Sequence, residues 1–239
     1  MKLIWLVGVI SSALMYADET TVFLNENHRL YIEPDVAYEI PSKTRDRSLT
    51  IKESGYLLGI NAGYEFLKAN SLYAGLEATF SMSNRFADLY FEDEKISEGE
   101  VKGFQNNASG MFGYTLVSSN VWLTPFSGAG CYFVSQKHEH LNLAYVPIGI
   151  KAEYRMANFS IGANAQQLHF VQVWHQYNDT KISENVFGDG NYGYEISLPL
   201  SFKMDTSDKH WHAAFEPYYL KLTSTLAFIG GRISALYNF

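Results

Sequence analysis

Charged side chains recur at every second position in several segments of this chain, and they are the groups that could act on ions or polar solutes. Carboxylates outnumber basic groups in the set, which comprises Glu33, Asp35, Glu39, Glu65, Glu77, Glu153, Glu195 and Glu216 against Lys151, Arg155, Lys203 and Arg232. Buried charges persist when they are paired, and rings of Asp or Glu favour cations in pores. The set is interpreted as a bracing network or as a gate with an acidic constriction, and the two roles are compatible.

Arg232 is expected to be central to this network. Counted from the ends of their segments, Glu33, Glu216 and Arg232 lie at similar depth, and closing a sheet would place the last strand between the ninth and the first. Arg232 is therefore predicted to lie between two carboxylates. The predicted charge site comprises Glu33, Asp35, Glu77, Lys151, Glu153, Arg155, Glu216 and Arg232.

The histidines and the cysteine give weaker signals. His138 and His140 flank Glu139, and His210 and His212 share a face at a strand start. A metal site needs three or four converging ligands, and each pair supplies two. They are therefore interpreted as surface or rim histidines, and no metal or cofactor is predicted. Cys131 is the only cysteine, which excludes an intramolecular disulfide.

The elements that must position these charges are strands, because alternation at period two places alternate side chains on opposite faces. Ten such segments follow residue 28. In the first segment, Leu30, Ile32 and Val36 lie on one face of the strand, and Glu33 and Asp35 lie on the other. The phase of the fifth, 121–135, stays open because proline and glycine interrupt it, and the seventh loses its contrast near residue 174.

The connections between these segments alternate in length. Those at 69–71, 118–120, 156–158 and 205–209 are short, whereas those at 41–52, 84–102, 136–140, 176–191 and 221–226 are mostly longer and polar. Short periplasmic turns and longer external loops are typical of outer-membrane barrels, and strands in lipid must close into a barrel to pair every backbone group. The predicted fold is all-β, a closed antiparallel transmembrane β-barrel of ten strands, with eight or twelve strands and a soluble β-sandwich as alternatives.

The N-terminus has the pattern of a secretory signal peptide. Lys2 precedes an apolar core from Leu3 to Ile10, and Ala17 precedes the polar Asp18. Residues 1–17 are predicted to be the signal peptide and residues 18–239 a single barrel domain. The formal net charge of -7, without any cluster of Lys or Arg, makes nucleic acid a poor candidate partner.

The last ten residues, GGRISALYNF, resemble the C-terminal targeting strand of outer-membrane barrels, which the barrel-assembly machinery reads through a terminal aromatic and alternating apolar residues. Ile233, Ala235, Tyr237 and Phe239 occupy those positions. LTPFSGAGCYF and YVPIGIKAEYRM are similar to strands of small OmpA-like and porin-family barrels. The resemblance implies an integral protein of the bacterial outer membrane, in contact with its lipids. The family includes pores, adhesins, structural anchors and a few enzymes.

The predicted function is a small or gated, cation-preferring pore or a structural barrel. The alternative is an adhesin or other surface-binding protein that acts through the polar segments 91–100 and 177–191. An enzyme is disfavoured, because the acidic and Asp–His pairs of the ten-stranded omptin proteases have no counterpart here. Lipid A deacylases place a His two residues before a nucleophilic Ser, and none of the seven histidines has that spacing. A triad assembled from distant strands stays open.

Overall fold

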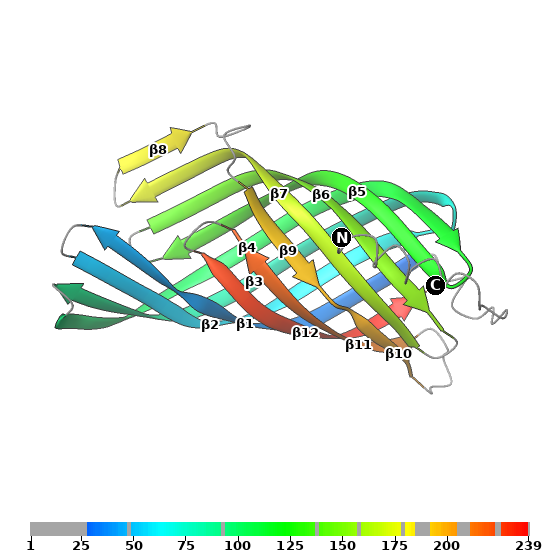
Figure 1. Cartoon of the computed structure of the whole chain (residues 1–239), viewed down its shortest axis with the longest axis horizontal. Helices are drawn as coiled ribbons and strands as arrows, with labels where there is room; N and C mark the ends of the chain where they lie inside the picture. Colours follow the sequence, from blue (N-terminus) through cyan, green and yellow to red (C-terminus); the bar gives the residue numbers. More distant parts are fainter. Residues whose placement is uncertain are drawn as a thin grey trace, which may run out of the picture.

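The computed structural model describes residues 28–46, 49–91, 94–136, 139–156, 159–177, 180–184, 192–204, 211–222 and 226–238. In these ranges the protein consists of strands, and one antiparallel sheet closes on itself into an elongated barrel (Figure 1). Within these ranges no helix has the length and the hydropathy that a membrane span needs. The predicted signal peptide, residues 1–17, and the terminal Phe239 lie outside the described residues.

Twelve strand segments form the described sheet. They are β1 (His28–Asp46), β2 (Leu49–Leu67), β3 (Ser71–Phe91), β4 (Glu94–Ser118), β5 (Val121–Gln136), β6 (Glu139–Arg155), β7 (Phe159–Tyr177), β8 (Thr180–Glu184), β9 (Tyr192–Ser197), β10 (Leu200–Lys203), β11 (Trp211–Lys221) and β12 (Ala227–Asn238). From β1 to β7 each strand pairs with its sequence neighbours, β11 pairs with β12, and β12 pairs with β1 to close the wall.

The wall has ten strands because β9 and β10 are two parts of one strand. Both pair with β7 on one side and with β11 on the other, and only Leu198 and Pro199 separate them. The backbone bonds continue through this break: Leu198 N donates to Pro217 O at 3.0 Å, and Gly162 N donates to Pro199 O at 2.7 Å. β8 pairs with β7 alone, beyond the wall. The prediction of a closed antiparallel ten-stranded barrel is confirmed.

The structure resolves the two strands whose phase was uncertain. On β5 the even-numbered side chains Trp122, Thr124, Phe126, Tyr132 and Val134 are buried in the lumen, whereas Leu123 and Cys131 are exposed outside. On β7 the register with β6 shifts, because Ala144 pairs with Gln172 and Tyr145 with Phe170. Val171 is therefore the extra residue of a β-bulge, which reverses the facing of the residues that follow. The alternation of apolar and polar residues is lost near residue 174 because this bulge exchanges the two faces of the strand.

Two segments expected to be long loops are strands instead. β1 and β2 pair as far as Asp46 and Leu49, and β3 and β4 pair as far as Phe91 and Glu94. Much of 41–52 and 84–102 therefore belongs to extended hairpins that project from one end of the barrel (Figure 1). We call this end the hairpin end and the opposite one, where His28 and Asn238 lie, the terminal end. Residues 94–100 are exposed on both faces of the strand, so the polarity of this segment was misread as a loop signal.

The short connections at 69–71 and 118–120 are tight turns as expected, whereas 157–158 and 205–210 lie outside the described residues. Asn70 and Ser119 adopt φ values of 50° and 54°, in the left-handed region that Asn tolerates better than most residues. The two turns are also linked to each other. Asn70 accepts hydrogen bonds from the backbone of Val117 at 3.0 Å and, through its carbonyl, from the Tyr114 hydroxyl at 2.7 Å.

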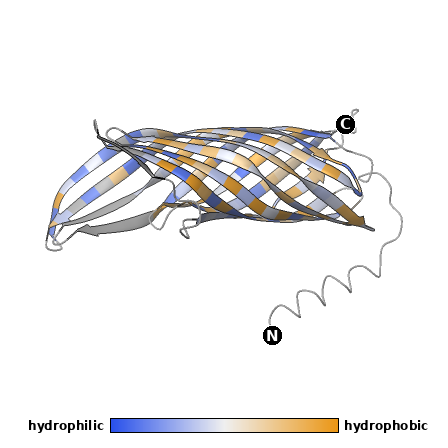
Figure 2. Ribbon diagram, turned by 90° about the horizontal axis from the view of Figure 1, so that it is seen from above, coloured by the Kyte–Doolittle hydropathy of each residue, from blue (hydrophilic) through white to orange (hydrophobic). Residues whose placement is uncertain are grey.

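The outer surface of the barrel is an apolar band, and hydrophobic and hydrophilic residues alternate along its strands (Figure 2). Exposed side chains along it include Ile32, Leu58, Phe80, Phe112 and Ile233. Aromatic pairs flank the band, with Trp211 against Tyr237 near the terminal end and Tyr38 against Tyr56 near the hairpin end, each with 5.1 Å between ring centroids. Such girdles are characteristic of transmembrane barrels.

Inside the wall, tyrosine rings cover glycines on the neighbouring strand. Tyr31 lies opposite Gly63, Tyr145 opposite Gly130, and Tyr218 opposite Gly230. A Cβ atom added to Gly230 would lie 2.6 Å from Tyr218 Cζ, so each glycine provides the space that a ring occupies. Aromatic packing over glycine helps to fix the register of paired strands.

Gly230→Ala is therefore expected to lower the free energy of unfolding by about 1–3 kcal/mol, as overpacking does in a filled interior. Gly99→Ala is the matched control, because nothing lies within 4 Å of the added Cβ atom. Urea denaturation of the refolded proteins, followed by tryptophan fluorescence, measures both. Equal midpoints for the two variants would show that the Tyr218 ring moves aside without cost.

Candidate functional site

Side chains fill the lumen in layers, and an apolar layer lies toward the hairpin end, with the buried Glu39–Arg85 ion pair (2.6 Å) beside it. This lid cluster is drawn from strands around the wall and includes Leu168, which is 0% exposed, and Phe170, which is 4% exposed. Tyr132 and Tyr145 stack within it at 5.4 Å between ring centroids. Its buried members are Ala37, Leu57, Tyr132, Leu143, Tyr145, Leu168, Phe170, Tyr218, Leu220, Leu222 and Phe228.

An acidic belt lies next to the lid cluster and surrounds the Arg232 guanidinium. Its members, besides Arg232, are carboxylates from four strands. Arg232 lies 3.4 Å from Glu195, 3.9 Å from Asp35 and from Glu77, and 4.0 Å from Glu216, measured between nitrogen and carboxylate oxygen. The strand register produces this arrangement, because Arg232 is directly opposite Asp35 on β1 and Glu216 on β11.

Tyr218 joins the lid cluster to the belt. The Arg232 guanidinium carbon lies 4.4 Å from the centre of the Tyr218 ring, a cation–π distance. The Tyr218 hydroxyl donates a hydrogen bond to Asp35 at 2.9 Å. Any movement of Arg232 therefore disturbs a member of the lid cluster directly.

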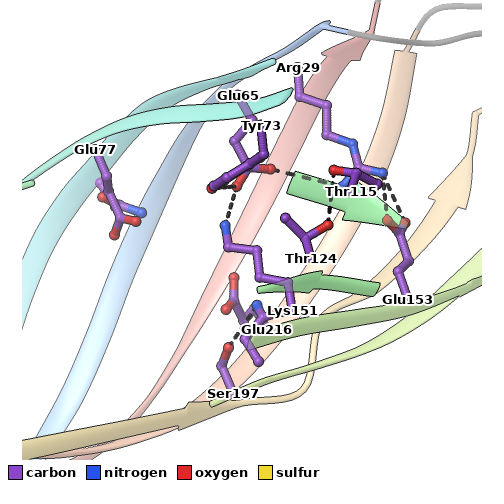
Figure 3. Close-up of polar contacts among 12 residues, drawn as sticks. Arg29, Glu65, Tyr73, Glu77, Thr115, Thr124, Lys151, Glu153, Ser197 and Glu216 are labelled. Carbon is purple, nitrogen blue, oxygen red and sulfur yellow. Dashed lines mark hydrogen bonds and ion pairs between the residues drawn. The ribbon is translucent and has the colours of Figure 1, made fainter. Parts of the chain in front are cut away.

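A second ionic group, the lower network, lies nearer the terminal end (Figure 3). Arg29 donates to both oxygens of Glu153 at 2.9 Å, and Arg155 donates to Glu153 at 2.9 Å. Lys151 pairs with Glu65, which also accepts a hydrogen bond from Tyr73 at 3.0 Å. The Arg155 guanidinium stacks on the Trp122 ring at 3.6 Å. This network has direct, short contacts, unlike the acidic belt.

A chamber of about 120 Å³ lies between the belt and the lower network. Its two sides differ in bulk. The side made by β2 to β5 carries the second apolar cluster, Leu67, Tyr73, Met111, Trp122 and Phe126. The opposite side is lined mostly by small residues, namely Ser160, Gly162, Ser197, Ser201, Ala214 and Ser234. The lumen is therefore least filled along the side formed by β7 and β9 to β12.

The predicted charge site divides between these two layers. Asp35, Glu77, Glu216 and Arg232 meet in the belt, whereas Lys151, Glu153 and Arg155 belong to the lower network. Glu33, which was expected to flank Arg232, instead accepts a hydrogen bond from Asn61 at 3.0 Å and lines the chamber. Asp35 takes the position opposite Arg232 because counting from strand ends ignores the stagger of adjacent strands.

Three charged participants, Glu65, Glu195 and Arg29, were not among the predicted site residues. Glu195 has the shortest of the four contacts with Arg232, and it also accepts a hydrogen bond from Gln166 at 2.8 Å. Arg29 holds Glu153 and lies 4.0 Å from Glu65. Arg29 shares the odd-numbered face of its strand with Glu33 and Asp35, and that alternation was the signal that could have identified it.

The charges of the lumen do not balance. Seven carboxylates contribute to the two layers and the chamber: Glu33, Asp35, Glu65, Glu77, Glu153, Glu195 and Glu216. Four basic side chains oppose them, Arg29, Lys151, Arg155 and Arg232, so the formal sum is -7 + 4 = -3. An acidic lumen of this kind attracts cations and repels anions.

Glu153→Gln is expected to lower the free energy of unfolding by about 3–5 kcal/mol, because it leaves Arg29 and Arg155 buried without their shared carboxylate. Glu98→Gln is the control, since this exposed residue only pairs with Lys95 on a projecting hairpin, and its effect should stay within about 0.5 kcal/mol. Urea denaturation measures both variants. A small effect of Glu153→Gln would mean that water already solvates the two guanidinium groups.

The histidines differ from the sequence interpretation in one case. His212 is 0% exposed and lies inside the barrel, so its assignment to the surface or rim is wrong. His140 forms a hydrogen bond with Ser135 at 2.8 Å and stacks on Phe133. His138 and His210 lie outside the described residues.

The projecting hairpin of β3 and β4 carries an ionic group of its own. Lys95 lies 2.8 Å from Asp88 and 2.9 Å from Glu98. Hydrogen bonds to Asp88 and Glu98 raise the pKa of Lys95 above its ordinary value. Residues 94–102 of β4 pair only with β3, because β5 joins β4 at Gly103. This hairpin therefore presents a charged free edge beyond the barrel wall.

Comparisons with known proteins agree with this architecture. No protein-family model matches the chain, and no curated protein matches its sequence. The outer membrane protease OmpT from Escherichia coli aligns with a TM-score of 0.60 at 10% identity, covering 92% of this chain and 99% of that one. At this identity the likeness shows the fold alone, which is that of bacterial outer-membrane β-barrels.

Two autotransporter domains align less closely. The transport unit of AIDA-I from Escherichia coli has a TM-score of 0.48 at 13% identity, covering 97% of this chain and 98% of that one. The translocator domain of NalP from Neisseria meningitidis has a TM-score of 0.49 at 12% identity, covering 97% and 92%.

Proposed function

We propose that this chain, whose fold is that of bacterial outer-membrane β-barrels, is a gated, cation-preferring pore in the outer membrane. The lid cluster lies in the lumen at the hairpin end, which supports a closed resting state for such a pore. The acidic belt lies directly behind the lid. Any path that opens through the lid must therefore pass Arg232 and its four carboxylates, and the formal lumen charge of -3 favours cations along that path.

The location in the outer membrane is part of the proposal. The apolar band and its flanking aromatic pairs suit a lipid bilayer, and its lipids would be the direct partners of the wall. Removal of residues 1–17 as a signal peptide would release the mature chain for assembly. The strand that carries Ile233, Ala235 and Tyr237 would engage the barrel-assembly machinery, together with Phe239.

The single observation that carries the pore proposal is the acidic belt directly behind a closed lid. Planar-bilayer recording of refolded residues 18–239 in a salt gradient tests it. Brief openings with a reversal potential of cation-selective sign are expected. Anion-selective openings would contradict the proposal, and so would silence in protein whose folding is shown by heat-modifiable gel mobility.

The double variant Glu77→Gln/Glu216→Gln is expected to shift the reversal potential toward zero, because it removes two of the carboxylates around Arg232. Glu98→Gln, which changes a carboxylate outside the wall, should leave the reversal potential unchanged. An unaltered reversal potential in the double variant would place the selectivity filter somewhere other than the belt.

A surface-binding protein is the second candidate, and the projecting hairpins favour it. Residues 94–100 are all exposed, and Ile96, at 57% exposure, lies at an irregularity of the strand register near the hairpin tip. A folded barrel that never conducts would favour this function. We propose no enzymatic activity, because the acidic and Asp–His pairs of the omptin proteases have no counterpart in the sequence.

A further inference from the structure

The acidic belt contains less positive charge than its carboxylates require. One guanidinium faces four carboxylates there, whereas the lower network sets Glu65 and Glu153 against Arg29, Lys151 and Arg155. Burying charge without compensation is costly. The belt therefore requires either protons on its carboxylates or an additional cation.

The distances leave room for a cation. Contacts in the lower network include three at 2.9 Å, the range of a direct charge-assisted hydrogen bond. The distances from Arg232 nitrogens to the belt carboxylates are longer, from 3.4 to 4.0 Å, so Arg232 lies among the four carboxylates without a short contact to any of them. Cavities lie on both sides of Arg232, the chamber of about 120 Å³ and a smaller one of about 20 Å³.

Gln105 provides an independent indication of an occupant. It is 8% exposed, it lines the smaller cavity together with Asp35 and Arg232, and its Oε1 atom accepts no hydrogen bond from the described residues. A buried acceptor without a donor is unfavourable. The cavity beside it has the volume of one water-sized group. A group in this cavity would donate a hydrogen bond to Gln105 and would lie beside Asp35, which is the belt carboxylate that lines the same cavity.

The kind of cation follows from the spacing of the ligands. Within the described ranges no three His, Cys, Asp or Glu side chains converge closely enough to hold a metal ion. A primary ammonium group needs no such convergence, because it has three N–H donors on a compact centre. The chamber adds room for several more atoms, and Tyr31 and the small side of the lumen line it.

We infer that the acidic belt binds a small aliphatic ammonium ion, which enters from the terminal end along the side lined by Ser160, Gly162 and Ser197. The inference rests on the proposed function for the role of the belt, but binding does not require conduction. Within the lumen the lid cluster blocks the hairpin end. The tight turns lie at the terminal end, and short turns are periplasmic in outer-membrane barrels, so the occupant would come from the periplasmic side.

The test is isothermal titration of refolded residues 18–239 with 1,4-diaminobutane at fixed ionic strength, with native mass spectrometry for stoichiometry. Saturable binding of one molecule per barrel is expected. The variant Glu77→Gln/Glu216→Gln should bind at least about tenfold more weakly, because two of the four carboxylates are neutralised. Glu98→Gln should bind like the unaltered protein, and neutral 1,4-butanediol should not bind.

If folded protein gives neither a heat of binding nor a mass adduct with 1,4-diaminobutane, the inference is overturned. The excess negative charge of the belt would then be neutralised by protons on its carboxylates. Equal affinity in the double variant, or equal binding of 1,4-butanediol, would overturn it as well. The outcomes separate it from the proposed function. Cation-selective currents without amine binding would retain the pore alone, and amine binding by a silent barrel would retain the binding site alone.

Discussion

Leu168→Ala combined with Phe170→Ala is expected to raise the mean current through the barrel at least tenfold, from rare openings to steady conduction. Both side chains are almost fully buried in the lid cluster on β7, and the interior of the cluster is close-packed. Their truncation removes the volume that separates the chamber from the hairpin end. Planar-bilayer recording at fixed voltage measures the change.

The matched control for this variant is Leu67→Ala with Met111→Ala. These two residues belong to the second apolar cluster, which lies beside the chamber and not across the lumen. Both double variants should lose several kcal/mol of stability, since each truncation of a buried side chain costs about 2–5 kcal/mol. Only the lid variant should conduct. Equal currents from the two folded variants would show that leakage follows from instability and not from removal of the lid.

Arg232→Met is expected to lower the free energy of unfolding by about 3–5 kcal/mol, because it leaves four carboxylates facing one another without their shared cation. The same change should increase conductance and strengthen the preference for cations, since it removes the positive charge from the belt. Urea denaturation and the reversal potential in a salt gradient provide independent readouts. Arg232→Lys should retain more of the stability than Arg232→Met.

A second substitution makes this prediction sharper. In Arg232→Met/Glu216→Gln the remaining repulsion is smaller, so part of the lost stability should return, which a double-mutant cycle measures as coupling. Lys102→Met is the control for charge removal at an exposed position outside the wall, where an effect within about 0.5 kcal/mol is expected. A strictly additive cycle would mean that Arg232 acts through packing on Tyr218 and not through its charge.

The outward and inward faces were predictable from the sequence because alternation depends on the pleat of each strand alone. Leu30, Ile32 and Val36 are exposed on the outer surface, and Glu33 and Asp35 are buried in the lumen, as the pattern required. The depth of a residue in the lumen was not predictable in the same way. It depends on the stagger between neighbouring strands, and this is why Asp35, and not Glu33, lies opposite Arg232.

Local irregularities account for the remaining differences. Gly128 and Gly130 have no side chain to indicate a face, so the phase of β5 could not be determined. The bulge at Val171 exchanges the two faces of β7, and period-two reasoning cannot detect it in a single strand. The lid cluster was not predicted at all, because its residues come from strands far apart in the sequence and look like ordinary inward positions.

The seam between β12 and β1 has a consequence for how the barrel reaches its native state. Before closure, Arg232 and Asp35 lie on two free strand edges, each without the partner that the completed wall provides. A half-closed sheet in lipid would expose both unpaired backbone groups and isolated charges. Intermediates of that kind are too unfavourable to accumulate. Closure should therefore be the rate-limiting, all-or-none step of insertion, so partially closed barrels should not be detected during refolding.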